Sequence, residues 1–175
     1  MDFLELCKMR QSCRAFTGQK VEHEKLAKLV EAGRSAPSAC NSQPWRFIVV
    51  EDEKLFPEVA KCGQLTGNPF TNDAGAFIVI LEEHATLKPI IRASHESQTF
   101  ARFDIGAAAA YICLEAAQLG LGACQIGLFD REKLGQLLGL PVEQRYGGLI
   151  VVGYPKDGAI REKARKTLEE VSKFI

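Results

Sequence analysis

The sequence predicts one layered domain of the α/β or α+β class, in which helices cover a β-sheet. Short apolar runs typical of buried strands alternate with helix-like segments along the 175 residues. No repeat, low-complexity tract or Ser/Pro-rich linker divides the chain, and its length suffices for one sizeable core. These patterns leave the order of the strands open.

The first helix is expected to begin at Asp2, with Glu5 reaching back as in a capping box. Phe3, Leu6 and Cys7 would form its buried stripe. The rest of the first half is expected to hold a helix over 22–33 stopped by Gly33, a strand over 46–50 buried on both faces, a short helix over 53–61 with Pro57 in its first turn, and a strand over 76–81.

The second half contains the clearest helix, over 104–120, with Asp104 as its cap and Gly120 as its end. It is apolar nearly all round and must be buried on several sides, while its alanines allow close approach of a neighbour or of a second copy of the chain. Before it, residues 84–103 show no clean period and are expected to form a loop or a loose helix.

Three further elements follow before the tail. We expect a strand flanked by glycines within 120–129, a helix from Asp130 to Gly139, and a last strand within 148–155. The tail over 156–175 is basic first and then apolar.

Charge and cysteine content exclude several classes of protein. With 22 basic and 22 acidic residues, the chain lacks the broad basic field of a nucleic-acid binder. Its six cysteines include no C-x-x-C pair, so we expect no metal site but free thiols in a reducing cytoplasm. No apolar run is long enough for a membrane span, and the first residues do not resemble a signal peptide.

Two basic segments are candidates for binding a phosphate. In R-Q-S-C-R, an extended backbone would direct Arg10, Ser12 and Arg14 to one side, where forked guanidinium donors suit a phosphate. If the tail folds back, Lys163 and Arg165 of R-E-K-A-R-K could complete the cage. The alternatives are a solvated face with ordinary ion pairs and an exposed basic turn.

The stretch A-P-S-A-C-N-S-Q-P-W offers Ser38, Asn41 and Gln43 on a loop fixed by Pro37 and Pro44. Such a rigid polar loop suits a flat ligand with polar edges, or it satisfies its own backbone groups.

The segment G-L-G-A-C-Q-I-G places glycines around a short strand, which allows close approach to the amides near Ile126 and Gly127. These glycines could also serve only as turns, and no full dinucleotide-binding fingerprint is present.

Together, R-Q-S-C-R-A-F, A-P-S-A-C-N-S-Q-P-W, D-I-G-A, L-G-L-G-A-C-Q-I-G-L-F-D, L-L-G-L-P and V-V-G-Y-P closely resemble the FMN-dependent nitroreductase family, in the family's order and over nearly the whole chain. The resemblance implies one domain over 1–175, an α+β, three-layer α/β/α sandwich with a central mixed sheet. It also implies a domain-swapped homodimer with one FMN in each of two interface clefts, in which the tail over about 160–175 clasps the partner.

The resemblance also implies the roles of particular residues. Arg10, Ser12 and Arg14 would hold the flavin phosphate and ribityl chain, with help from the tail. The ring would meet the partner's loop on one side and a backbone segment at N5 on the other. The residues concerned are Lys163 and Arg165 in the tail, Pro37, Ser38, Asn41 and Gln43 in the loop, and Ile126 and Gly127 at N5.

The implied activity is hydride transfer from NADH or NADPH to flavin N5, then electron transfer to nitroaromatics, quinones or similar electron-poor acceptors by a ping-pong mechanism. No catalytic side chain is needed, since the cofactor carries the chemistry. The alternatives are a specialised flavin reaction on one metabolite and a non-enzymatic FMN-binding redox partner. The chain departs from the family at Gln11, where a second Arg is frequent, at Gln125, where an aromatic is common, and in its short variable segment 84–103.

Overall fold

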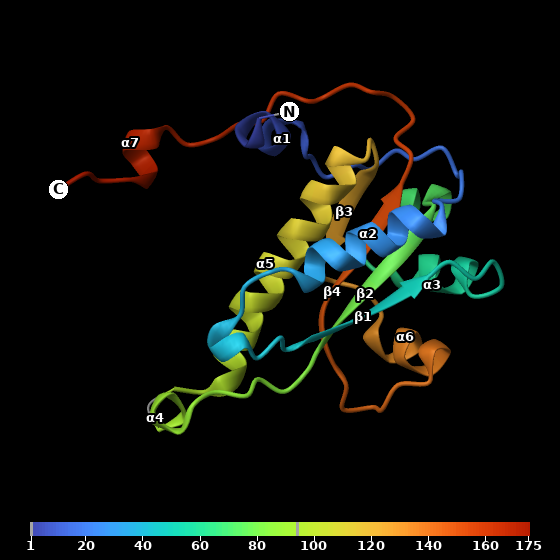
Figure 1. Ribbon diagram of the computed structural model, residues 1–175. Helices are drawn as coiled ribbons and strands as arrows, with labels where there is room; N and C mark the ends of the chain where they lie inside the picture. Colours follow the sequence, from blue (N-terminus) through green and yellow to red (C-terminus); the bar gives the residue numbers. More distant parts are fainter. Residues whose placement is uncertain (1, 94) are drawn as a thin grey trace.

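The fold is built on a four-stranded antiparallel sheet with the order β1-β2-β4-β3 (Figure 1). The computed structural model describes residues 2–93 and 95–175. The strands are β1 (Trp45–Val50), β2 (Ala76–Glu82), β3 (Gly122–Ile126) and β4 (Arg145–Gly153). The expectation of a mixed sheet is therefore wrong for these four strands. A parallel pairing occurs outside them, as an isolated bridge between Ser12 and Ala123.

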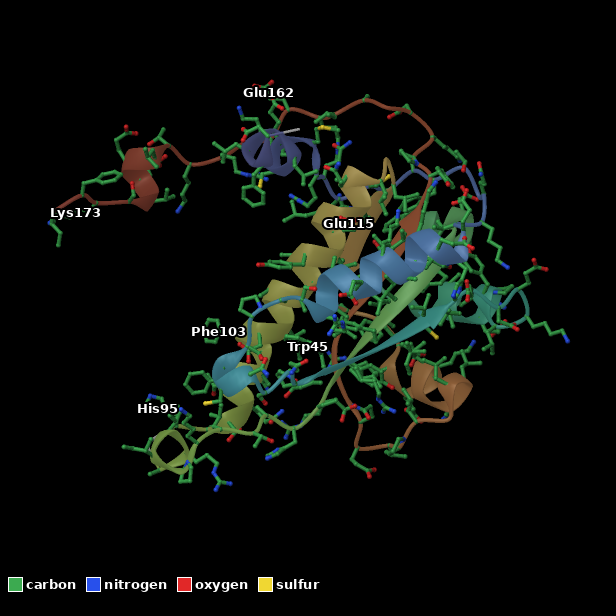
Figure 2. All side chains as sticks on the ribbon, in the orientation of Figure 1. Trp45, His95, Phe103, Glu115, Glu162 and Lys173 are labelled. Carbon is green, nitrogen blue, oxygen red and sulfur yellow. The ribbon has the colours of Figure 1, made fainter. Side chains whose placement is uncertain are left out.

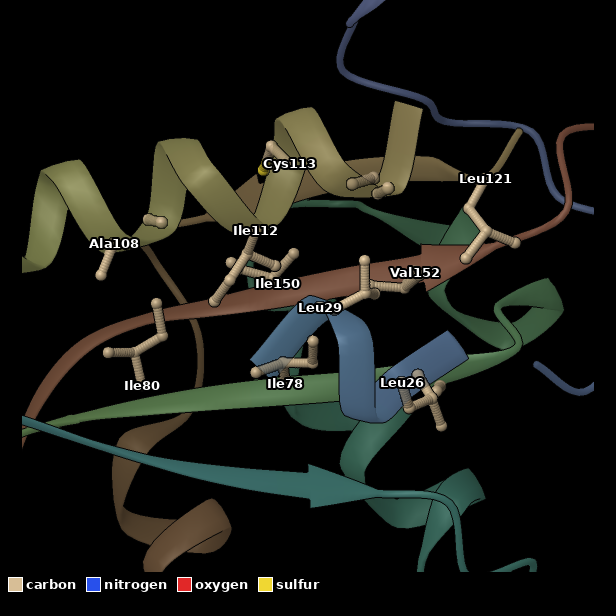
Figure 3. Close-up of a cluster of buried hydrophobic side chains, with 14 of the residues drawn as sticks. Leu26, Leu29, Ile78, Ile80, Ala108, Ile112, Cys113, Leu121, Ile150 and Val152 are labelled. Carbon is tan, nitrogen blue, oxygen red and sulfur yellow. The ribbon is translucent and has the colours of Figure 1, made fainter. Parts of the chain in front are cut away.

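Alternating side chains of the central strands divide the interior into two cores. Ile78 and Ile80 of β2 lie in the core beneath α2 (His23–Arg34) and α5 (Ser97–Gln118), as Figure 3 shows. Phe77 and Val79 point to the opposite core, beneath α3 (Phe56–Cys62) and α6 (Arg131–Leu138). This period of two on a strand covered on both faces produces the expected three-layer α/β/α sandwich.

β1 does not have the fully buried pattern expected for residues 46–50. Arg46 is exposed, and Phe47, Ile48 and Val49 are only half-buried. The reason is its place at the edge of the sheet, where it pairs with β2 alone. By contrast, every residue of the central strand β2 is buried.

α5 begins at Ser97, so part of the segment expected to be a loop or loose helix belongs to this helix. The short helix α4 (Pro89–Arg92) precedes it. The sequence suggested that Asp104 caps this helix, but Asp104 lies inside α5, so that prediction is wrong. Gly120, with φ of 73°, follows the end of the helix as expected.

Glycine in α2 serves close packing and not the termination of the helix. The helix continues through Gly33 to Arg34, and a Cβ built on Gly33 would come within 2.8 Å of the Ile112 side chain. A larger residue at this position would separate α2 from α5.

On the other face, α6 follows its local signals. The Asp130 side chain accepts a hydrogen bond from the Lys133 N–H at 3.0 Å, and Gly139 ends the helix with φ of 63°. The first turn of α3 contains Pro57, as predicted. The 3₁₀ turn η2 (Pro69–Asp73) lies between α3 and β2.

The two ends of the chain lie outside the sandwich. In α1 (Phe3–Met9), Glu5 reaches back to the Asp2 N–H at 3.2 Å, but no residue of the helix is buried and Phe3 is 63% exposed. The expected buried stripe is therefore wrong for the single chain. The tail passes α1 and ends in the short helix α7 (Leu168–Val171), which projects away from the sandwich (Figure 1).

Candidate functional site

The segment after α1 runs beside the first part of β3. Ser12 forms a parallel bridge with Ala123, and the Cys13 N–H donates to the Ala123 carbonyl at 2.9 Å. This pairing fixes the backbone on which Arg10 and Arg14 lie. Together with the tail it forms a pocket of about 250 Å³, which we call the cationic pocket, lined by Arg10, Gln11, Ser12, Arg14, Arg161, Glu162, Lys163 and Arg165.

The structure thus brings together all five residues that the sequence assigned to a phosphate cage. It adds three that sequence reasoning missed, Gln11, Arg161 and Glu162. Arg161 belongs to the same basic run as Lys163, which was a usable signal. Gln11 was noted only as a departure from the family pattern, and nothing in the sequence indicated its contacts with the tail.

The cationic pocket carries a net positive charge, since five Arg and Lys side chains line it together with one acid, Glu162. Within the part of the chain that the structure describes, none of its Arg and Lys side chains forms an ion pair. Burial lowers the pKa of Lys163, and the neighbouring Arg10, Arg165 and Arg161 lower it further. Since cations at close quarters repel one another, this pocket suits an anion with more than one charge.

The loop containing the 3₁₀ turn η1 (Ala39–Asn41) has a conformation that few residues adopt. Cys40, Asn41 and Gln43 have φ of 54°, 53° and 48°. Positive φ is uncommon for residues other than glycine, so tertiary contacts must hold the loop.

Four hydrogen bonds and one buried ring hold it. Ser38 Oγ accepts from the Gln43 N–H at 2.9 Å, and the Gln43 amide donates to the Asn41 carbonyl at 3.3 Å. Asp104 Oδ2 accepts from the Ala39 N–H at 3.1 Å, and Ser42 Oγ accepts from the Thr86 N–H at 2.7 Å. Trp45 lies in the core at the end of the loop, while Pro37, Asn41 and Gln43 remain exposed.

This loop and the cationic pocket lie at different ends of α5. Asp104 contacts the loop, whereas Ala117 lies with Arg10 in the wall of a second pocket of about 190 Å³. Thirteen helical residues correspond to about 20 Å. In Figure 2, Trp45 and Phe103 lie toward one end of α5, and Glu162 lies near the other. Within one chain, the two groups of predicted residues do not meet.

Ile126 and Gly127 lie at the far end of β3 from the cationic pocket. The Ile126 side chain is buried in the core, so only its backbone can meet a ligand. Gly127 is exposed, and a Cβ built on it would meet no atom within 4 Å. From Ala123, beside Ser12, to Gly127 is about 13 Å along an extended chain. An elongated ligand could therefore reach both places.

The cysteines near this surface are not poised to react. Burial raises the pKa of the Cys13, Cys113 and Cys124 thiols. The Gln125 amide lies 3.4 Å from Cys113 Sγ. Because the thiolate is the reactive form, these side chains act as packing groups.

Over residues 2–93 and 95–175, His, Cys, Asp and Glu form no cluster that could hold a metal ion. No helix in the same residues combines the length and apolar character needed to cross a membrane.

Comparison with known proteins assigns the class that this sandwich and pocket represent. Residues 7–154 match the Nitroreductase family. The iodotyrosine deiodinase of Thermotoga neapolitana is 30% identical over 164 residues, which cover 87% of this chain and 88% of the relative. The chain belongs to the nitroreductase family.

Two further relatives carry more specific names. The "FMN reductase [NAD(P)H]" of Bacillus subtilis is 28% identical over 87% of this chain and 65% of its own. The FMN-dependent nitroreductase of Clostridium difficile R20291 has a solved structure with a TM-score of 0.72 and 26% identity, covering 96% of this chain and 94% of that one.

Proposed function

We propose that this protein is an FMN-dependent oxidoreductase. It takes hydride from NADH or NADPH and passes electrons to nitroaromatics, quinones or similar electron-poor acceptors, with donor and acceptor binding in turn. The observation that carries the proposal is the cationic pocket, whose Arg and Lys side chains have no acid partner among the described residues and which lies beside the start of β3. The names of the Bacillus and Clostridium relatives support the choice of cofactor and electron donor.

The residues present suit both the phosphate end and the ring end of FMN. Arg10, Arg14, Lys163 and Arg165 supply charge-assisted donors to the phosphate, and Ser12 adds a hydroxyl. The backbone at Ile126 and Gly127 would meet the edge of the ring, and the missing side chain of Gly127 would leave room for close approach. Bound FMN supplies the hydride chemistry at N5, and the chain itself needs no nucleophile or acid.

The proposal includes a homodimer in which each site is shared. Because the loop lies about 20 Å along α5 from its own cationic pocket, we assign Pro37, Ser38, Asn41 and Gln43 to the site of the partner. Exposed apolar side chains offer the surface for such a dimer: Phe3 and Leu4 on α1, Phe103 and Tyr111 on α5, and Leu168, Val171, Phe174 and Ile175 in the tail. Residues 1–175 form one domain in this scheme, and the tail over about 160–175 clasps the partner.

A second candidate is a specialised flavin reaction on one halogenated aromatic compound. The similarity to an iodotyrosine deiodinase over most of both chains favours it. The short segment before α5 does not decide between the two, since it is limited to α4 and a few connecting residues. A cytoplasmic setting suits either candidate, and all six cysteines are unpaired.

The absorption spectrum of the purified protein under anaerobic conditions tests the proposal. We expect a yellow protein that NADH or NADPH bleaches and that regains its colour with a nitroaromatic or a quinone. Recovery only with iodotyrosine would favour the second candidate. Bleaching by a reduced ferredoxin or flavodoxin but not by NAD(P)H would favour a redox partner. A colourless protein that takes up no added FMN would contradict all three.

A further inference from the structure

The tail forms one wall of the cationic pocket, and few contacts hold it there. Residues 156–167 contain no helix or strand, and most of their side chains are exposed. Arg161, Lys163 and Arg165 contribute three of the pocket's five cations from this segment. Burial lowers the pKa of Lys163, and the neighbouring Arg10, Arg165 and Arg161 lower it further, so cations that repel one another lie close together at this wall. Some contact must therefore offset the repulsion.

The Gln11 side chain provides that contact. Its Nε2 donates to the Ala159 carbonyl at 2.7 Å, and its Oε1 accepts from the Arg161 N–H at 3.1 Å. Oε1 also lies 3.3 Å from Arg161 Nε. A carboxamide can both donate and accept, so it engages the carbonyl and N–H of alternate tail residues, as a neighbouring strand would.

Two other bonds to the tail use main-chain acceptors of the N-terminal segment. Arg161 Nη2 donates to the Ser12 carbonyl at 2.6 Å, and Lys163 Nζ donates to the Lys8 carbonyl. Both employ the cations that the pocket would present to an anion. Gln11 is a neutral side chain that binds the tail backbone itself, and it makes no hydrogen bond to Lys163 or Arg165 among the described residues.

We propose that Gln11 is a positioning residue for the phosphate-binding wall: its bidentate grip on Ala159 and Arg161 keeps Lys163 and Arg165 over the pocket and slows release of a bound phosphate ester. The inference rests on the proposed function for the identity of that ester, FMN. The grip itself is a property of the polypeptide and can be measured without flavin.

Three variants separate the grip from general effects on folding. Gln11→Met keeps the length of the side chain and removes its hydrogen bonds, and Gln11→Ala removes both. Gln136→Met, on the exposed face of α6, is the matched control, since its amide makes only a long 3.5 Å contact with Glu132. Trypsin serves as the probe because it cleaves after Arg161, Lys163 and Arg165.

In the flavin-free protein, we expect Gln11→Met and Gln11→Ala to accelerate tryptic cleavage within 161–166, monitored by mass spectrometry. Loss of the two hydrogen bonds to the tail backbone alone predicts an increase of about 5- to 150-fold. In the flavin-loaded protein, FMN fluorescence should recover faster on dilution by a similar factor. The dependence of FMN affinity on salt should also weaken, because fewer cations engage the phosphate. A role in folding alone would leave that salt dependence unchanged.

Cleavage and FMN release at the rates of the wild type and of Gln136→Met would overturn the proposal. So would an effect of Gln11→Ala that Gln11→Met does not reproduce, because shape and not hydrogen bonding would then matter. If the wild type fails to bind FMN at all, the proposed function fails, while the tryptic rates in the flavin-free protein still decide whether Gln11 holds the tail.

Discussion

The Asp104 carboxylate accepts a hydrogen bond from the backbone N–H of Ala39 at 3.1 Å, across 65 residues of sequence. It thereby ties α5 to the loop in which Cys40, Asn41 and Gln43 have positive φ. A charged acceptor makes this bond stronger than an ordinary one. The helix thus holds the loop in a conformation that the loop's own residues disfavour.

Replacement of Asp104 should loosen the loop. We expect Asp104→Ala to lose about 1–3 kcal/mol of stability, since a bond to a charged group is removed, and to lower Tm by several degrees. FMN affinity should fall as well if the loop contacts the ring. Asp104→Asn is the matched control, because its side-chain oxygen still accepts from Ala39. Equal thermal stability for Asp104→Ala and wild type would show that the loop holds its conformation without this bond.

Removal of one guanidinium from the cationic pocket should release the cofactor and spare the fold. Arg10→Ala loses charge-assisted bonds worth about 1.5–3 kcal/mol, which corresponds to FMN binding weaker by roughly 10- to 150-fold. Flavin content and the Kd for added FMN measure this effect, and circular dichroism checks the fold. Arg34→Ala is a control, because Arg34 pairs with Glu31 on α2, outside the pocket. Undiminished flavin content in Arg10→Ala would remove Arg10 from the site.

Truncation after Lys166 tests the role of the tail. The missing segment includes α7 and the exposed side chains of Leu168, Val171, Phe174 and Ile175. Because these contact no core in the single chain, we expect the truncated protein to fold but to dissociate more readily. Sedimentation at several concentrations measures the change. A double Ser172→Ala, Lys173→Ala variant retains the apolar residues and should remain dimeric. A truncated protein that associates like the full chain would exclude the tail as a clasp.

Acid should weaken one link between α3 and α6. Lys133, with Lys61 adding to it, lowers the pKa of Glu58 to about 2. A carboxyl group whose pKa is lower in the folded than in the unfolded protein stabilises the fold at any pH above its pKa in the unfolded protein. This stabilisation is lost as the pH falls toward the pKa of the group in the folded protein. The Tm difference between wild type and Glu58→Gln should therefore be constant near neutral pH and shrink from about pH 4.5 to pH 2. The pair is exposed, so high salt should reduce the difference at every pH. A difference that ignores both pH and salt would contradict this assignment.

The sequence correctly predicted the helices that begin and end at residues with a local capping role. Asp130 and Gly139 bound α6 as expected, because a capping side chain and a left-handed glycine act within a few residues. The alternation of buried strands with helices along the chain predicted a layered α/β or α+β fold, and the family resemblance added the three layers. The extended segment at Arg10 and the return of the tail also agree with the sequence interpretation.

Other features depend on contacts that no local pattern encodes. Asp104 has the chemistry of a helix cap, yet it lies inside α5, and its carboxylate accepts a hydrogen bond from the distant loop. Gly33 has the chemistry of a helix stop but serves the approach of Ile112. Of the stripe predicted on α1, Leu6 and Cys7 are half-buried and Phe3 is exposed. For Asp104 and Gly33, the decisive neighbour lies far away in the sequence.

The bonds between Gln11 and Arg161 join positions 150 residues apart. During synthesis, Arg10 and Arg14 therefore leave the ribosome about 150 residues before Arg161, Lys163 and Arg165 of the opposite wall. Closing so long a loop has an entropic cost that the folded sandwich must already have met. A chain that stops before Arg161 would lack three of the pocket's five cations and would hold the flavin weakly even if its sandwich folds.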